Sequence, residues 1–259
     1  LFGLVSASGS LAFEKSTGTV TLADTASTDV AVDQLLIGGS NLNGFLGYNG
    51  GSADAIGLEL TNMSFAIAIL SDQDVNSNDQ WTSVQASVDT VGFVGVDGLT
   101  LEASSLTVEV NSAGADNDKA SVVDYSDGVT DLTIATGPSS ATTLDMDGSL
   151  GELLRAKGNF DIDLFGLVSA SGSLAFEKST GTVTLADTDS TDVAVDQLLI
   201  GGSNLNGFLG YNGGSADAIG LELTNMSFAI AILSDQDVNS SDQWTSVQAS
   251  VDTVGFMGV

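Results

Sequence analysis

GLVSASGSLAFE, residues 3–14, is the stretch that decides the fold expected of this chain. It begins with a Gly-Leu pair, places Ser10 seven residues after Gly3, and then sets large apolar side chains on alternate positions, at Leu11 and Phe13. Successive side chains of a β-strand point to opposite faces, so alternation of this kind predicts a strand. A helix would space its apolar residues three or four positions apart.

The same pattern occurs twice more, as GLELTNMSFAIA at 57–68 and GLTLEASSLTVE at 98–109. Its serines are Ser10, Ser64 and Ser105, which a parallel ladder of strands would stack on one another. Counted on to the next copy at residue 166, the starts are 54, 41 and 68 residues apart. Spacings this unequal count against a strictly regular solenoid.

A much larger repeat encloses these motifs. Residues 164–259 repeat residues 1–96, with three differences, namely Ala26/Asp189, Asn78/Ser241 and Val94/Met257. Residues 1–163 are therefore one full unit, and residues 164–259 are part of a second. Self-similarity at a fixed period is typical of arrays in which neighbouring units bury surface against each other.

Composition limits the partners of the chain. It has 34 acidic and 5 basic residues, a net charge of −29, and 42% hydrophobic residues among 259, so we expect a folded protein with an anionic surface. Nucleic acid and anionic membranes are not expected as partners, because phosphate binding needs clustered Lys and Arg, which this chain lacks. The longest apolar runs, such as FAIAIL at 65–70, are too short to cross a bilayer. Cations are the expected counterpart.

Location is inferred from several features together. Cysteine is absent, and combined with acidity and duplication this favours an extracellular or cell-surface protein. The chain begins at Leu1 and both ends fall inside the repeat, so we expect a segment of a longer polypeptide.

Four local predictions follow from the strand pattern. In LTLEASSLTVEVNS, residues 99–112, the apolar residues change from odd to even positions after Ser104. A similar change near Thr90 predicts a bulge or turn there. Asp97-Gly98 between apolar residues predicts a hairpin, or the corner of a solenoid coil. FAIAIL, with large and small residues alternating, is expected to be covered on both faces and more tightly on its alanine side.

One short stretch departs from the strand pattern. GELLRAKG at 151–158 is the one segment expected to form a helical turn. Its Arg155 and Lys157 are expected to pair with Asp161 and Asp163 just after them, a surface contact of small energetic weight.

Catalytic chemistry finds little support. The chain has no His and no Cys, which excludes Ser-His and Cys-His catalysis and histidine-based metal sites in this segment. We therefore expect no enzyme and no required cofactor. The alternative is a carbohydrate-binding or carbohydrate-active β-helix module that recognises surface glycans. For it, the repeated Trp81 and Trp244 would offer a sugar platform, although we favour a role for them in capping the core.

One loop suggests a metal. Residues 72–79 place oxygen-bearing side chains on alternate positions, as in the first half of a calcium loop. Ser77 and Ser83 replace the glycine and glutamate of an EF-hand, which excludes that motif but leaves a looser calcium site or an ordinary acidic turn. The candidate ligands are Asp72, Asp74, Asn76, Asn78 and Asp79, with Asp235, Asp237, Asn239 and Asp242 in the second copy.

Three stretches carry a resemblance to a known kind of protein. GFVGVDGLTLEASSLTVEV at 92–110, GELLRAKGNFDIDLFGLVSASGSLAFEK at 151–178 and FLGYNGGSADAIGLEL at 45–60 resemble tandem repeats of very large bacterial surface or secreted proteins, of the adhesin-like and haemagglutinin-like kind. The resemblance implies an extended β-rich fibre outside the cell and no catalytic residues.

These observations give one expectation for the whole chain. We predict an all-β, elongated, repetitive stack resembling a β-solenoid, with tandem antiparallel β-sandwich domains as the alternative. Its function is then structural, as a fibre, stalk or filament that associates with itself through end-to-end repeats and lateral contacts, and that presents an adhesive surface.

Overall fold

The computed structural model describes residues 3–24, 29–114, 121–126, 128, 130, 132–186 and 192–258. The chain folds almost entirely into strands, and among the described residues the one helical element is a single 3-10 turn, η1 at Gly148–Leu150. The strands are β1 (Val5–Val20), β2 (Val30–Tyr48), β3 (Ile56–Asp72), β4 (Gln80–Val94), β5 (Leu99–Ala113), β6 (Thr133–Gly137), β7 (Ser140–Thr143), β8 (Leu153–Leu164), β9 (Val168–Val183), β10 (Val193–Tyr211), β11 (Ile219–Asp235), β12 (Gln243–Ser250) and β13 (Thr253–Met257).

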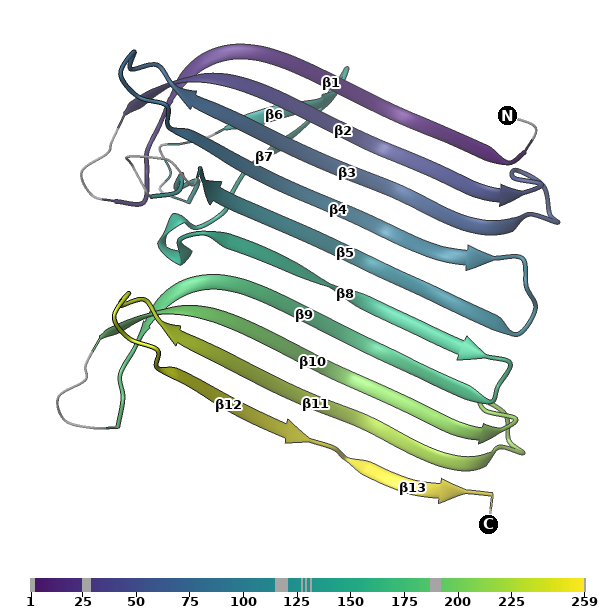
Figure 1. The fold of residues 1–259 in the computed structure, drawn as a ribbon. Helices are drawn as coiled ribbons and strands as arrows, with labels where there is room; N and C mark the ends of the chain where they lie inside the picture. Colours follow the sequence, from purple (N-terminus) through teal and green to yellow (C-terminus); the bar gives the residue numbers. More distant parts are fainter. Residues whose placement is uncertain are drawn as a thin grey trace.

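Eleven of these strands form one large sheet in the order β1-β2-β3-β4-β5-β8-β9-β10-β11-β12, with β13 also paired to β11. Each neighbouring pair is antiparallel, and the sheet does not close on itself (Figure 1). The all-β prediction is confirmed. The first unit supplies β1 to β5 and β8, and the second supplies β9 to β13, so a single sheet runs through both.

Antiparallel order explains the unequal motif spacings. The motif copies start β1, β3, β5 and β9, so they fall on every second strand of the sheet. The longest spacing, 68 residues, is the one that contains the additional segment between β5 and β8. The motif serines are not stacked in a parallel ladder, because an antiparallel strand separates each from the next. Ser10 pairs with Ser40, and Ser64 pairs with Ser87.

Two local predictions are confirmed. Asp97-Gly98 lies in the turn of the β4–β5 hairpin, where the Leu99 amide donates to the Val96 carbonyl at 3.1 Å and Gly98 has a φ of 77°. The phase slip after Ser104 is a bulge, since the β5–β8 register shifts between Ser104 and Thr107. Ser105 there has a φ of 52°.

Two other local predictions are wrong. The predicted bulge or turn near Thr90 is absent, because β4 passes through Thr90 without a register shift. The face of β4 that carries Trp81 is covered at one end only, so the apolar residues at the other end change face without any change in the backbone. Residues 153–158 begin strand β8 and form no helical turn, since pairing with β5 and β9 on either side satisfies their backbone.

The core lies between the sheet and the segment that connects β5 to β8. Residues 121–150 of this connection are here called the crossover segment, and those that the structure describes lie over β1 to β5 on one face and include the β6–β7 hairpin (Figure 1). We call this face of the sheet the crossover face and the opposite one the open face. The core residues include Val32, Leu36, Ala66, Ala68, Leu70 and Trp81 from the sheet and Val123, Tyr125, Ile134, Leu144 and Met146 from the crossover segment.

FAIAIL, residues 65–70, was expected to be covered on both faces, and the structure covers one face only. Ala66 and Ala68 are fully buried under the crossover segment, which confirms tight cover on the alanine side. Phe65, Ile67 and Ile69 on the open face are half-buried, and among the described residues no element packs over them. The expectation of cover on both faces is therefore wrong for this chain on its own.

Candidate functional site

The predicted calcium ligands lie in two equivalent loops, between β3 and β4 and between β11 and β12. In the first loop, Asp72 Oδ1 accepts from the Asp74 amide at 2.9 Å, and Asp74 Oδ1 accepts from the Asn76 amide at 2.9 Å. The Asp79 amide donates to Ser77 Oγ at 3.1 Å. These contacts fold the loop on itself through side-chain caps of its own backbone.

The second loop repeats these contacts. Asp235 Oδ1 accepts from the Asp237 amide, and Asp237 Oδ1 accepts from the Asn239 amide, each at 2.9 Å. Hydrogen bonds from the backbone and side chain of Asn239 lower the pKa of Asp237 below its usual value. Asp242 is exposed, whereas its counterpart Asp79 is buried. Asn78 of the first loop is exposed.

The carboxylates of Asp72, Asp74, Asp235 and Asp237 thus each accept a hydrogen bond from the backbone of their own loop. Nowhere in the described part of the chain do three or more acidic side chains converge closely enough to hold a metal ion. The calcium site stays a prediction.

An arginine at the boundary between the two units joins three neighbouring strands. Arg155 on β8 donates through Nη1 to Glu109 Oε2 on β5 at 3.0 Å, and through Nε to Glu177 Oε2 on β9 at 2.8 Å. Partial burial lowers the pKa of Arg155, but hydrogen bonds to Glu177 and Glu109 outweigh it and raise that pKa overall. The predicted pairing with Asp161 and Asp163 is wrong, because in a strand the residues beside Arg155 are those of the neighbouring strands.

This arginine link was missed in the sequence because its partners are remote. Glu109 and Glu177 lie 46 and 22 residues from Arg155 along the chain. Only the register places them directly opposite, with Glu109 paired to Arg155 and Arg155 paired to Glu177. The signal was a rare basic residue on a strand whose two neighbours each carry an acidic residue on the same face.

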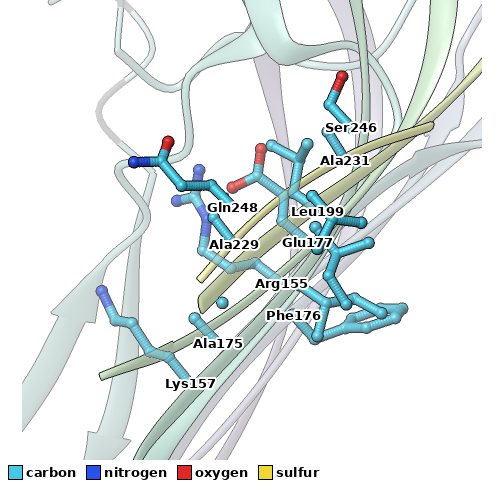
Figure 2. Close-up of a pocket in the computed structure, with 14 residues that line it drawn as sticks. Arg155, Lys157, Ala175, Phe176, Glu177, Leu199, Ala229, Ala231, Ser246 and Gln248 are labelled. Carbon is cyan, nitrogen blue, oxygen red and sulfur yellow. Dashed lines mark hydrogen bonds and ion pairs between the residues drawn. The ribbon is translucent and has the colours of Figure 1, made fainter. Parts of the chain in front are cut away.

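The crossover face of the second unit is hollowed into a groove of about 670 Å³. Figure 2 shows its lining, which comes from β8 to β12 and combines small apolar residues with a few polar ones. The lining residues that share the crossover face are Arg155, Lys157, Ala175, Glu177, Leu199, Gly201, Ala229, Ala231, Ser246 and Gln248. No described segment covers this face as residues 121–150 cover the first unit (Figure 1).

The open face carries a continuous apolar row across ten strands. Each residue of the row is directly paired with the next, so all side chains point the same way. The row consists of Leu11, Gly39, Phe65, Ala86, Val108, Ala156, Phe176, Ile200, Ile230 and Val247. Leu11, Val108, Phe176 and Val247 of the row are exposed. Exposed apolar side chains gathered along one face mark an interaction surface.

The two edges of the sheet are also available for pairing. β1 and β12 end the strand order, and each has one neighbour among the described strands. β1 has the same sequence as β9, VSASGSLAFEKSTGTV. β9 uses its outer edge to bind β8, over the register from Leu154 opposite Lys178 to Leu164 opposite Val168. The edge of β1 that faces away from β2 pairs with no described strand, and it offers the same residues that accept β8 at the unit boundary.

Trp81 is in the core, as the packing interpretation predicts. It is fully buried, and its Nε1 donates to the Ser121 carbonyl at 2.9 Å. Trp244, the same position in the second unit, is half-buried. Trp81 is therefore not accessible as a sugar platform in this chain.

Comparison with known proteins gives no relatives: no family model, no curated protein and no solved structure matches this chain. In the part of the chain that the structure describes, no helix has the length and apolar character needed to span a membrane.

Proposed function

We propose that this chain is part of an extracellular structural repeat protein whose units lie side by side in one long β-ribbon, forming a fibre or stalk on a bacterial cell surface or matrix. The observation that carries the proposal is the β8–β9 pairing, which runs through the unit boundary without a register shift. Because β1 presents the residues of β9 at its free edge, a preceding unit can join in the same way.

The ribbon grows perpendicular to its strands. One unit contributes six strands to the sheet, β1 to β5 and β8. Neighbouring strands lie about 4.8 Å apart, so each unit adds roughly 29 Å to the length. The Arg155 link between Glu109 and Glu177 supports the junction, since it ties the last strands of one unit to the first strand of the next.

The bacterial and extracellular parts of the proposal rest on composition and resemblance. Acidity, absence of cysteine and tandem duplication together favour export, and residues 45–60, 92–110 and 151–178 resemble the repeats of very large bacterial surface proteins. High net charge keeps such a ribbon soluble and opposes uncontrolled edge-to-edge aggregation, which is the hazard of open sheets. The apolar row on the open face supports lateral association, with a second copy of the ribbon as the partner.

The test measures how length grows with the number of units. Chains with one, two and three additional copies of residues 1–163 are compared by small-angle scattering and electron microscopy. We expect the long dimension to increase by about 29 Å for each unit. A parallel solenoid with three coils per unit would add only about 14 Å. Separate globular sandwich domains would add roughly 40 Å with visible constrictions between them.

A further inference from the structure

Two nearly identical halves of the sheet differ in whether their crossover face is covered. In the first unit Leu36 is 4% exposed, and Ala66 and Ala68 are 0% exposed. In the second unit the counterparts of the two alanines are exposed or half-buried, at Ala229 and Ala231 respectively. The difference comes from the crossover segment, which lies over the first unit and has no described counterpart over the second (Figure 1).

The crossover segment is held on the first unit by specific polar contacts as well as apolar burial. Its Tyr125 hydroxyl donates to Ser83 Oγ at 2.8 Å, and its Asp145 Oδ1 accepts from Gln85 Nε2 at 3.0 Å. Two of its backbone carbonyls are also bound. Trp81 Nε1 donates to one at 2.9 Å, and Ser40 Oγ donates to the other at 3.0 Å.

Gly38 is the point of closest backbone approach. A Cβ atom at this position would lie 2.2 Å from the Ala135 carbonyl oxygen of β6, so no other residue fits without moving the backbone. The hairpin therefore rests directly on β2. Because of this close contact, Ile134 on the hairpin and Leu144 just after it are almost fully buried.

The second unit keeps each of the sheet residues that make these contacts. Gly201, Ser203, Trp244, Ser246 and Gln248 are the counterparts of Gly38, Ser40, Trp81, Ser83 and Gln85. The three positions that differ between the units lie elsewhere. Asn78/Ser241 is in the acidic loop, Val94/Met257 is at the end of a strand, and Ala26/Asp189 lies outside the described residues.

We propose that the crossover face of β9 to β12 is a docking site for another copy of the crossover segment. The occupant is defined by the sequence of residues 121–150, because the contact residues of the site match those that already bind this sequence. The groove in Figure 2, of about 670 Å³, is the space that such a hairpin enters. This inference concerns a face of the sheet, whereas the proposed function concerns its edges, so either can fail alone.

The experiment uses the 259-residue chain and a synthetic peptide with the sequence of residues 121–150. Trp244 is the reporter, because docking should bury it as Trp81 is buried, while Trp81 is already inaccessible. We expect the peptide to shift tryptophan emission to shorter wavelength and to protect it from acrylamide, at about 0.15 M salt to screen repulsion between the two acidic partners. A Trp244→Phe variant should lose this signal.

Gly201→Ala is the decisive variant. In this chain the nearest atom to a Cβ at Gly201 is the Phe228 carbonyl oxygen at 3.9 Å, so the substitution fits the uncovered face. In the docked arrangement the new methyl group would occupy the place of the hairpin backbone, as at Gly38. We expect binding at least about tenfold weaker, from the cost of overpacking. A peptide with Ile134→Asp should also bind at least about tenfold more weakly.

A covalent version removes the dependence on peptide affinity. The chain is extended after Val259 with a copy of residues 97–152, and we expect Trp244 to be protected without added peptide. The proposal is overturned if Trp244 stays accessible in the extended chain, or if Gly201→Ala binds the peptide as tightly as the unsubstituted chain. It is equally overturned if Trp244 is protected by self-association of the 259-residue chain and the peptide adds nothing.

Discussion

Gly38 and Gly201 have the same sequence neighbours but different surroundings, which makes them a matched pair. We expect Gly38→Ala to lower the free energy of unfolding by roughly 1–3 kcal/mol, because the added methyl group meets the Ala135 carbonyl oxygen. Gly201→Ala should stay within about 0.5 kcal/mol of the parent, since its Cβ has open space. Urea unfolding of both variants is the measurement, and equal effects would contradict the close contact at Gly38.

Tyr125 anchors a buried polar network. Its hydroxyl donates to Ser83 Oγ, which donates to Asn111 Oδ1 at 3.1 Å, and Asn111 Nδ2 donates to the Val123 carbonyl at 2.7 Å. We expect Tyr125→Phe to destabilise the fold by about 0.5–1.5 kcal/mol through the lost hydrogen bond. Tyr211→Phe is the control, because Tyr211 is 62% exposed.

The same tyrosine predicts an alkaline pH dependence. Burial raises the pKa of Tyr125 well above its ordinary value of 10.0. A raised pKa in the folded state means that this stability is present below about pH 10 and is lost as the pH rises further, because the unfolded chain ionises first. Thermal melts between pH 8 and pH 11 should show the loss in the parent and in Tyr211→Phe. An unchanged alkaline loss in Tyr125→Phe would assign it to other groups.

At the level of strands, Arg155 fixes the register between β5, β8 and β9. Replacing it in Arg155→Met leaves Glu109 and Glu177 without their shared cation, and we expect a loss of roughly 1.5–3 kcal/mol, the range for hydrogen bonds to charged groups. Lys157→Met is the control on the same strand and face, because Lys157 makes no ion pair with the described residues. Urea unfolding compares the two, and a smaller effect at Arg155 than at Lys157 would contradict the assignment.

Calcium binding by the two acidic loops is a prediction that can be tested at the scale of these elements. We expect calcium at about ten times its dissociation constant to add about 1.4 kcal/mol per loop. The measurement is a thermal melt in calcium against chelator at matched ionic strength. A variant with Asp72→Asn, Asp74→Asn, Asp235→Asn and Asp237→Asn should lose the shift. A shift that survives in this variant would place calcium elsewhere, and no shift in the parent would make both loops ordinary acidic turns.

For the whole molecule, the apolar row of the open face predicts association between copies. Net charge of −29 opposes this contact at low salt, and the Debye length falls from about 30 Å at 0.01 M to about 3 Å at 1 M. Analytical ultracentrifugation should therefore show a dimer fraction that rises with salt.

Two variants test whether this association uses the row. Phe176→Ser together with Leu174→Ser should reduce dimerisation, because both side chains are exposed on the open face. Val238→Ser, in the acidic loop and 96% exposed, should leave it unchanged. A chain that remains monomeric at every salt concentration would refute association through this face.

Much of the fold follows from local sequence. Alternation at Leu11 and Phe13 predicts a strand, the slip after Ser104 predicts a bulge, and Asp97-Gly98 predicts a hairpin turn, because each depends on the backbone of a few consecutive residues. The repeat itself also follows directly from comparing residues 1–96 with residues 164–259.

The tertiary structure alone decides which strands meet and which face is covered. Alternation assigns side chains to two faces but does not say what lies against either one. The pairing of Arg155 with Glu109 and Glu177 depends on a register between remote strands. Trp81 and Trp244 show the limit most clearly. Their local sequences differ only at Asn78/Ser241, yet one is buried and the other half-buried, because burial depends on whether a distant segment folds over the sheet.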